Sequence, residues 1–192
     1  MIKKILHFLV RLLLILLLMA LVLGSILLYN LQMNKSFITT FYTVTVDKPV
    51  EDLRIVLLSD LHLSEYGTDN ADLVQKVRNL APDLIAVADA LNDETNALDD
   101  VCTILICHCP EVLDTSLADE KFDLVLSGHA HGGQVRIGGH GLWSTSQGFL
   151  PKYTSGVNQM GESQVVISRG LGDSEPYPRI FNQPELVVVD VN

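Results

Sequence analysis

Acidic residues are missing from the start of this chain, and that absence divides it into two parts. No Asp or Glu precedes Asp47, so all 23 acidic residues lie beyond residue 33, whereas three of the 13 Lys and Arg lie before it. Residues 34–192 therefore carry 10 basic and 23 acidic side chains, a formal charge of −13. A domain this acidic has no long-range attraction for polyanions, so we expect no nucleic-acid binding.

Charged residues are also absent from Leu12 to Tyr29, where leucine dominates. Eighteen helical residues at about 1.5 Å each cover roughly 27 Å, which is close to the hydrocarbon thickness of a bilayer. The basic residues before the run, Lys3, Lys4 and Arg11, predict that the N-terminus stays in the cytoplasm and the following domain lies outside.

A cleaved secretory signal is the alternative to a membrane anchor. Such a signal has an apolar core of about 7–15 residues followed by a small-x-small site, and Leu23-Gly24-Ser25 is a poor match. We therefore expect residues 1–33 to be an uncleaved, single-pass anchor in the cell membrane. Residues 34–192 have the size of one extracytoplasmic domain.

Cysteine is scarce, with three residues at 102, 107 and 109. An odd number in an exported domain argues against a disulfide framework. The triplet Cys107-His108-Cys109 suggests a zinc site, but in a strand the two cysteines face one side and His108 the other. Since no second Cys or His pair lies nearby, we expect these cysteines to be small buried residues.

Short apolar runs rich in β-branched residues predict strands over 53–59, 84–88, 103–107 and 123–127, after an extended segment within 37–50. Between the first two runs, Asn70 as N-cap, apolar residues at helical spacing and Pro82 as a stop predict a helix. A short helix is expected within 110–120, and further strands over 134–137, 164–168 and 185–191. This order predicts an α/β sandwich of two sheets.

Polar motifs follow the first four of these strands. They are Asp60-Leu61-His62, Asp89, His108 and Gly128-His129-Ala130-His131. Ligands of α/β sheets gather at the carboxyl ends of strands, so we expect these two aspartates and four imidazoles to meet. In an extended segment, residues two apart project to the same side. This would let Asp60 with His62, and His129 with His131, each ligate one ion.

A carboxylate such as Asp89 can bridge two cations. Two cations about 3.5–4 Å apart clamp a phosphoryl group and lower the pKa of a bound water. Mixed oxygen and nitrogen ligands favour Mn, Fe or Zn over Mg or Ca. The motifs thus predict a hydrolytic centre with two divalent transition metals.

Taken in order, these motifs resemble the calcineurin-like metallophosphoesterases, in particular their membrane-anchored or exported bacterial branch. The resemblance runs from about Arg54 to Val191. Its carriers are residues 55–62, 82–85, 108–110 and 127–134, and, in the tail, 148–153, 168–172 and 184–186. It implies an αββα sandwich, with two packed mixed sheets flanked by helices, and a hydrolase that cleaves phosphomonoesters or phosphodiesters.

The resemblance also implies roles for single residues. One metal would be held by Asp60, His62, Asp89 and His131. The other would be held by Asp89, His108 and His129, with Asp89 bridging. Lys152 and Arg169 lie in family-like loops, where they either contact substrate or serve the scaffold. The substrate would be a phosphate ester, and tethering favours one derived from lipid or the cell envelope.

The chain departs from the family between Asp89 and His108. Ala88 stands where the family has glycine, and Asp93 is a fallback for the bridging role. The family's Gly-Asn-His-Glu or Gly-Asn-His-Asp motif is absent, only 18 residues separate Asp89 from His108, and 93–101 resembles a junction across a deletion. The fold is then expected to lack part of its middle, with apolar sheet surface exposed.

This departure removes one ligand of the second metal and the expected general acid, which is typically worth about 10²–10⁴ in rate. No catalytic residue besides the metal ligands is identified. We expect metal binding to be retained and turnover to be weak or absent. The alternative function is a non-catalytic, metal-binding, membrane-anchored domain with a binding or regulatory role. A third interpretation, in which the histidines are merely structural, would be excluded by metal-dependent stabilisation.

Overall fold

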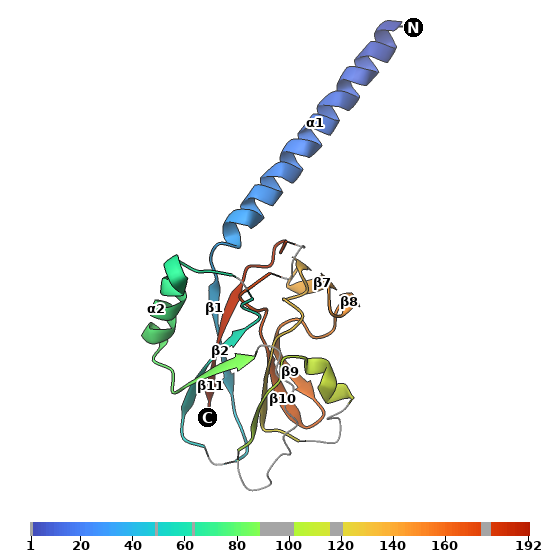
Figure 1. Cartoon of the computed structure of the whole chain (residues 1–192). Coiled ribbons are helices and arrows are strands. Elements are labelled where there is room, and N and C mark those ends of the chain that lie inside the picture. Colours follow the sequence, from blue (N-terminus) through green and yellow to red (C-terminus); the bar gives the residue numbers. More distant parts are fainter. Residues whose placement is uncertain (1, 49, 63, 89–101, 116–120, 174–177) are drawn as a thin grey trace.

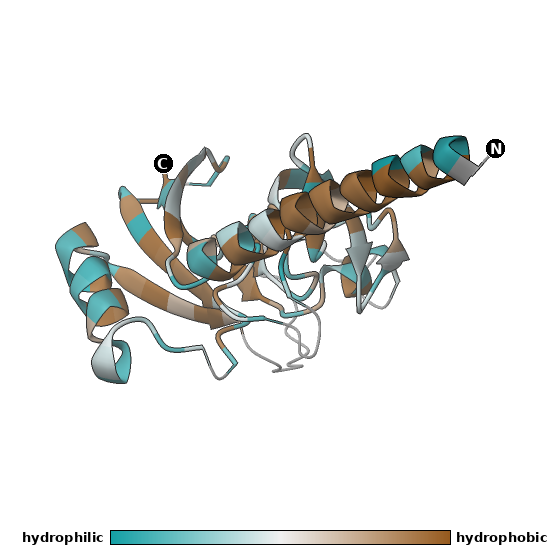
Figure 2. Cartoon of the chain, turned by 90° about the horizontal axis from the view of Figure 1, so that it is seen from above, coloured by the Kyte–Doolittle hydropathy of each residue, from teal (hydrophilic) through white to brown (hydrophobic). Residues whose placement is uncertain are grey.

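The computed structural model describes residues 2–48, 50–62, 64–88, 102–115, 121–173 and 178–192. A long helix, α1 (Ile2–Met33), projects from a body of strands (Figure 1). From Lys3 to Met33 this helix is long and apolar enough to cross a membrane, and its apolar stretch is not buried against the rest of the chain. Figure 2 shows apolar residues, coloured brown, along most of the helix. An apolar N-terminal helix is thus confirmed.

The first sheet contains four strands in the order β1 (Ile38–Val44), β11 (Glu185–Val191), β2 (Leu53–Ser59) and β3 (Leu84–Ala88). Strand β11 runs parallel to β1 and antiparallel to β2, and β2 runs parallel to β3. The sheet is therefore mixed, as predicted.

The second sheet has the order β4 (Ile104–Ile106), β5 (Leu124–Ser127), β10 (Ser163–Ile167) and β9 (Gly156–Met160). Strand β5 is parallel to both β4 and β10, while β9 is antiparallel to β10. A smaller antiparallel sheet is formed by β6 (Val135–Ile137), β7 (His140–Ser144) and β8 (Gly148–Phe149).

The two four-stranded sheets pack face to face through alternate residues of their strands. Ile55 and Leu57 of β2 point into this interface with Val187 of β11, and they meet Leu124 and Leu126 of β5. Complete burial of each such side chain is worth about 1.5–3 kcal/mol. The two-sheet sandwich predicted from the order of strands is confirmed.

The helix α2 (Ala71–Leu80) covers the outer face of the first sheet. Leu73, Val77 and Leu80 pack there against Val56 and Val188. The short 3₁₀ helix η2 (Pro110–Asp114) lies outside the second sheet, and its Leu113 is buried. The predicted helix within 110–120 is therefore one short 3₁₀ segment in its described part.

Asn70 lies at the N-cap of α2, as predicted, but it does not cap the helix through its side chain. Its backbone is left-handed, with φ 59°, and its side-chain oxygen accepts a hydrogen bond from the N–H of Tyr66 at 2.9 Å. The helix ends at Leu80 because Ala81 turns into the left-handed region and Pro82 follows. Asn70 thus orders the preceding loop instead of the first turn.

Strand β3 exposes apolar side chains at the edge of the first sheet. Ile85 and Val87 are 48% and 55% exposed. They pair in register with Val56 and Leu58, so they lie on the face that α2 covers elsewhere. Exposed apolar residues on an edge strand invite association. The internal shortening near 93–101, from which exposed apolar sheet surface was expected, lies outside the described residues and stays a prediction.

Candidate metal centre

The candidate centre forms where β2, β4 and β5 end, around the carboxylate of Asp60. Asp60 follows β2 directly and is fully buried. Its Oδ1 lies 3.6 Å from Nε2 of His131 and 3.7 Å from Nε2 of His108. The backbone N–H of His129 donates to both carboxylate oxygens, at 3.1 and 3.2 Å. Asp60 therefore lies between residues from both sheets.

A first group of possible metal ligands consists of Asp60, His62 and His131, whose ligand atoms all lie within 4.8 Å of one another. The two imidazole rings stack, and their Nε2 atoms are 3.1 Å apart. Burial lowers the pKa of His131, although Asp60 partly opposes the shift. Nδ1 of His131 lies 3.1 Å from the carbonyl of Gly172. Donation to that carbonyl leaves the Nε2 lone pair facing Asp60 and His62, which fits a cation.

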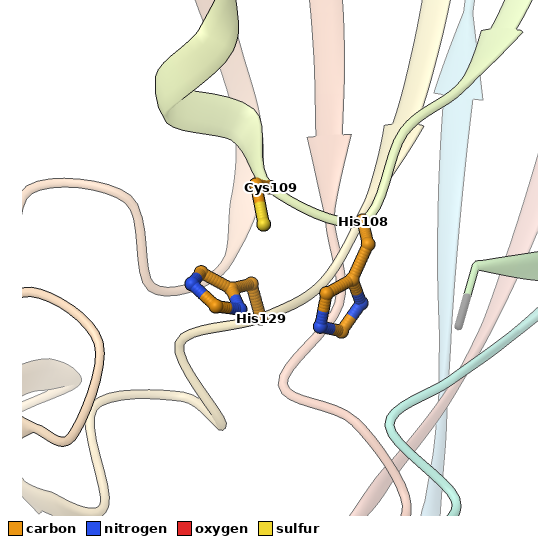
Figure 3. Close-up of side chains that lie close together, drawn as sticks. All are labelled: His108, Cys109 and His129. Atoms are coloured by element: carbon orange, nitrogen blue, oxygen red, sulfur yellow. The ribbon is translucent and has the colours of Figure 1, made fainter. Parts of the chain in front are cut away.

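A second group consists of His108, Cys109 and His129, whose ligand atoms also lie within 4.8 Å of one another. Figure 3 shows the three side chains converging from the segment after β4, the start of η2 and the loop after β5. Nδ1 of His108 lies 3.2 Å from the carbonyl of Ala88, so donation there leaves Nε2 facing Asp60. Burial lowers the pKa of His129, which favours the neutral ring that binds metals.

The backbone at these ligands is strained. Asp60, His62, His129 and His131 have φ angles of 50°, 47°, 79° and 46°. Residues other than glycine rarely adopt positive φ, and such strain is concentrated at functional sites. The prediction of an extended Asp-x-His and His-x-His geometry is wrong, because tight left-handed turns bring these side chains together instead.

Glycines allow other loops to pack directly on Asp60. A Cβ on Gly170, which has φ +76°, would lie 2.6 Å from Cβ of Asp60, and one on Gly128 would collide with the carboxylate. The N–H of Gly172 donates to the carbonyl of Asp60 at 2.6 Å. The motif around Gly128 already indicates this role from the sequence, whereas residues 168–172 stand out there only as a family-like segment.

Arg179 holds this glycine loop against His131, and sequence reasoning missed it. Its guanidinium is fully buried and donates to the carbonyls of Gly172 at 2.9 Å and Arg169 at 2.8 Å. A further contact of 3.4 Å reaches the carbonyl of His131, and Asp173 forms an ion pair at 3.1 Å. An arginine in a polar loop carries no local signal that it will be buried.

Both basic residues proposed for substrate contact are paired with carboxylates. Arg169 lies 3.0 Å from Glu185. Lys152 lies 3.1 Å from Asp114 and has its ammonium 4.4 Å from the ring centroid of Tyr153. These pairs suit a scaffold role, and substrate contact stays a prediction. Asp89 and its fallback Asp93 lie outside the described residues.

The centre lies near the beginning of β1, the strand that follows α1 in Figure 1. The first residue of β1, Ile38, pairs with Glu185, whose N–H donates to the carbonyl of Gly170 at 3.0 Å. Near the end of α1, the side-chain oxygen of Asn30 accepts a hydrogen bond of 2.6 Å from the N–H of Phe181. The loops that surround Asp60 are thus tied to the end of the helix.

Comparison with known proteins gives several partial matches. The chain is 33% identical over 90 residues to the metallophosphoesterase YkuE of Bacillus subtilis, covering 47% of this chain and 31% of that protein. It is 30% identical over 92 residues to the phosphodiesterase YaeI of Escherichia coli, covering 46% and 32%. It is 35% identical over 113 residues to the metallophosphoesterase Cj0846 of Campylobacter jejuni, covering 58% and 27%.

Over about half of its length, the chain is thus similar to proteins named metallophosphoesterase or phosphodiesterase, which supports the calcineurin-like metallophosphoesterase superfamily. It spans about a third of the length of the curated metallophosphoesterases that it matches. No protein-family profile and no solved structure matches it. The two groups of ligand-type side chains around Asp60 are the candidates for the metal ligands that this similarity implies.

Proposed function

We propose that the protein is a metal-dependent phosphoesterase that hydrolyses phosphomonoesters or phosphodiesters. The observation that carries this proposal is the convergence of the His62 and His131 Nε2 atoms, 3.1 Å apart, beside the buried carboxylate of Asp60. The two Nε2 atoms lie at hydrogen-bond distance, and when Nδ1 of His131 donates to the carbonyl of Gly172, the same spacing lets both rings offer Nε2 to one cation beside Asp60. Similarity to proteins named metallophosphoesterase or phosphodiesterase suggests the type of reaction.

The ligands that we assign divide between two divalent transition metals. The first metal takes Asp60, His62, Asp89 and His131. The second takes Asp89, His108 and His129, with Asp89 bridging. Mixed carboxylate and imidazole donors suit Mn, Fe or Zn. When bound, such cations supply Lewis-acid activation of the phosphate ester and of water.

The protein's own part in the reaction is to orient these donors. The carbonyls of Ala88 and Gly172 fix the imidazoles of His108 and His131. The left-handed turn at His131 and the buried Arg179 hold that ring against Asp60. Groups that hydrogen-bond to metal ligands in this way are typically worth about 10–100-fold in metal affinity or activity.

The place of the centre supports a substrate at the membrane surface. We assign α1 as an uncleaved anchor in the cell membrane, with the N-terminus cytoplasmic and the domain of residues 34–192 outside. Because the loops around Asp60 are tied to Asn30 and to the first residues of β1, the centre faces the membrane side of the domain. A phosphate ester of a lipid or of another cell-envelope component would meet it there.

A second candidate, a non-catalytic metal-binding domain, is favoured by the region after β3. The chain contains no Asn-His pair. Ile85 and Val87 are exposed where the family-like middle segment would begin. In this case the internal shortening near 93–101 has removed the acid and one ligand, while the Asp60 group still binds metal and serves binding or regulation.

The two candidates are separated by the hydrolysis of bis-p-nitrophenyl phosphate by the full chain in detergent, with and without Mn²⁺. The phosphoesterase proposal predicts Mn²⁺-dependent turnover that Asp89→Ala abolishes. His140→Ala is the matched control, because His140 is an exposed histidine on β7, outside the two ligand groups. Retained metal binding without turnover would favour the second candidate, and turnover unaffected by Asp89→Ala would contradict the assigned ligands.

A further inference from the structure

One ligand-type side chain in the centre has no role in the assignment above. Cys109 lies with His108 and His129, and their Nδ1 or Nε2 and Sγ atoms are all within 4.8 Å of one another (Figure 3). The strand argument, which placed His108 and Cys109 on opposite sides, is wrong here. Strand β4 ends at Ile106, so the chain has left the strand before it reaches both residues, and Cys109 instead precedes η2 with φ −99° and ψ 102°.

The other two cysteines lie elsewhere. Cys107 is buried in the core outside the second sheet, beside Leu105 and Leu113. Cys102 precedes β4 and is close enough to Asp123 and Lys48 for their charges to affect its thiol. Among the three cysteines, Cys109 is therefore the one that joins a group of possible metal ligands.

A second observation points to a cation at this group. Both carboxylate oxygens of Glu111 are buried, and they have no hydrogen-bonding partner among the described residues. Glu111 lies near enough to His129 and Cys109 for its charge to act on both. A buried carboxylate without a partner costs free energy, and a nearby cation removes that cost.

We propose that Cys109 is a ligand of the second metal, where its thiolate, with His108 and His129, forms a site that prefers zinc. This inference rests on the proposed function. On binding, the thiol proton leaves to solvent as the sulfur–metal bond forms, so that one proton is released for each metal bound there. The carboxylate of Glu111 then balances the charge of the ion.

The proposal changes what the missing Asn-His motif means. A sulfur ligand takes the place of the absent asparagine, so the second position can hold metal in the shortened chain. Thiolate and imidazole ligands favour Zn²⁺, whereas carboxylate and water favour Mn²⁺. We therefore expect the two positions to differ in metal preference, with Mn²⁺ bound well at the Asp60 group and Zn²⁺ or Co²⁺ at the Cys109 group.

The test uses cobalt as a spectroscopic probe of the full chain in detergent. Metal is removed, Co²⁺ is added, and the near-ultraviolet absorption that arises from thiolate-to-cobalt charge transfer is recorded. We expect the band in the wild type and in Cys102→Ser, and its loss in Cys109→Ser, which differs by one sulfur atom. In Cys109→Ser, the zinc affinity of the second position should fall by more than the ~10–100-fold that is typical when a residue hydrogen-bonded to a metal ligand is lost.

A second readout is the number of thiols that an alkylating reagent modifies with and without Zn²⁺. Zinc should protect one thiol in the wild type and in Cys102→Ser, and none in Cys109→Ser. Cobalt binding without a charge-transfer band, or a band that survives Cys109→Ser, would overturn the role of Cys109 and leave the proposed phosphoesterase intact. Failure to bind cobalt at all would overturn both proposals.

Discussion

Replacement of Glu185 by glutamine tests how the loop around Asp60 is held. The Glu185 carboxylate accepts hydrogen bonds from the Arg169 guanidinium at 3.0 Å, from the Arg169 N–H at 3.0 Å and from the Thr40 hydroxyl at 2.6 Å. The Glu185 side chain is almost fully buried, and that of Arg169 is mostly buried. Glu185→Gln keeps the shape but removes the charge, and its NH₂ group faces a donor.

The expected cost follows from these contacts. Breaking a buried ion pair by removing one partner costs about 3–5 kcal/mol. Arg169 keeps some exposure to solvent, and the introduced glutamine would retain one acceptor oxygen for its neighbours. We therefore expect Glu185→Gln to lower the free energy of unfolding by about 3 kcal/mol. The matched control is Glu162→Gln, which removes the same charge from an exposed pair with Lys121 at 2.9 Å. Exposed pairs contribute little to stability.

The pH dependence has a definite sign. Burial acts to raise the pKa of Glu185, but the hydrogen bond and charge of Arg169 outweigh it, and the pKa is lowered overall. A carboxyl whose pKa is lower in the folded state stabilises the fold above its ordinary pKa and loses this contribution as the pH falls through the folded value. The deficit of Glu185→Gln should therefore shrink in acid.

The assay is urea unfolding of the full chain in detergent at neutral and acidic pH. Fluorescence of Trp143, the one tryptophan of the chain, and near-ultraviolet circular dichroism report the loss of tertiary structure. The reasoning would be refuted if Glu185→Gln were no less stable than Glu162→Gln at neutral pH, or if its deficit grew as the pH fell.

A matched pair of glycine substitutions tests the packing of the glycine loop on Asp60. Gly170→Ala should destabilise the fold by more than the ~1–2 kcal/mol of left-handed strain and weaken metal binding, because its Cβ would lie 2.6 Å from that of Asp60. Gly161 has φ +58° and open space around it, so Gly161→Ala should lower stability only by the left-handed strain. Equal losses in thermal unfolding would contradict this. Replacing the exposed Ile85 and Val87 together by threonine should change stability by less than about 0.5 kcal/mol per site and reduce self-association in light scattering. Unchanged association would show that this edge is not adhesive.

The sequence was sufficient for the strands that lead to the candidate centre and for the meeting of their polar ends, whereas β7, β8 and β9 were not predicted from it. Runs such as 55–58 and 124–126 are apolar throughout because both faces of these strands are covered, and this pattern is local. Ligands of α/β sheets gather at the carboxyl ends of strands, so Asp60, His108 and the 129–131 pair could be predicted to meet although they follow strands of two different sheets. The helix before Pro82 was equally visible in its spacing of apolar residues.

Other features depend on contacts between distant segments. Arg179 is buried because carbonyls of residues 131, 169 and 172 surround it. No local sequence pattern predicts these contacts. Cys109 joins the histidines because β4 ends early, a boundary that apolar composition does not define. Left-handed turns at Asp60 and His62 likewise follow from packing against Gly170 and Gly172 and not from local propensity.

The central claim, a metal centre around Asp60, is tested most directly by thermal unfolding of the full chain in detergent with and without Mn²⁺. A ligand that binds only the folded state at 100 times its Kd stabilises it by about 2.7 kcal/mol. We predict a rise in melting temperature in the wild type and in His140→Ala, and none in Asp60→Asn combined with His131→Ala. An equal rise in all three proteins, or no rise in the wild type with either Mn²⁺ or Zn²⁺, would contradict the account.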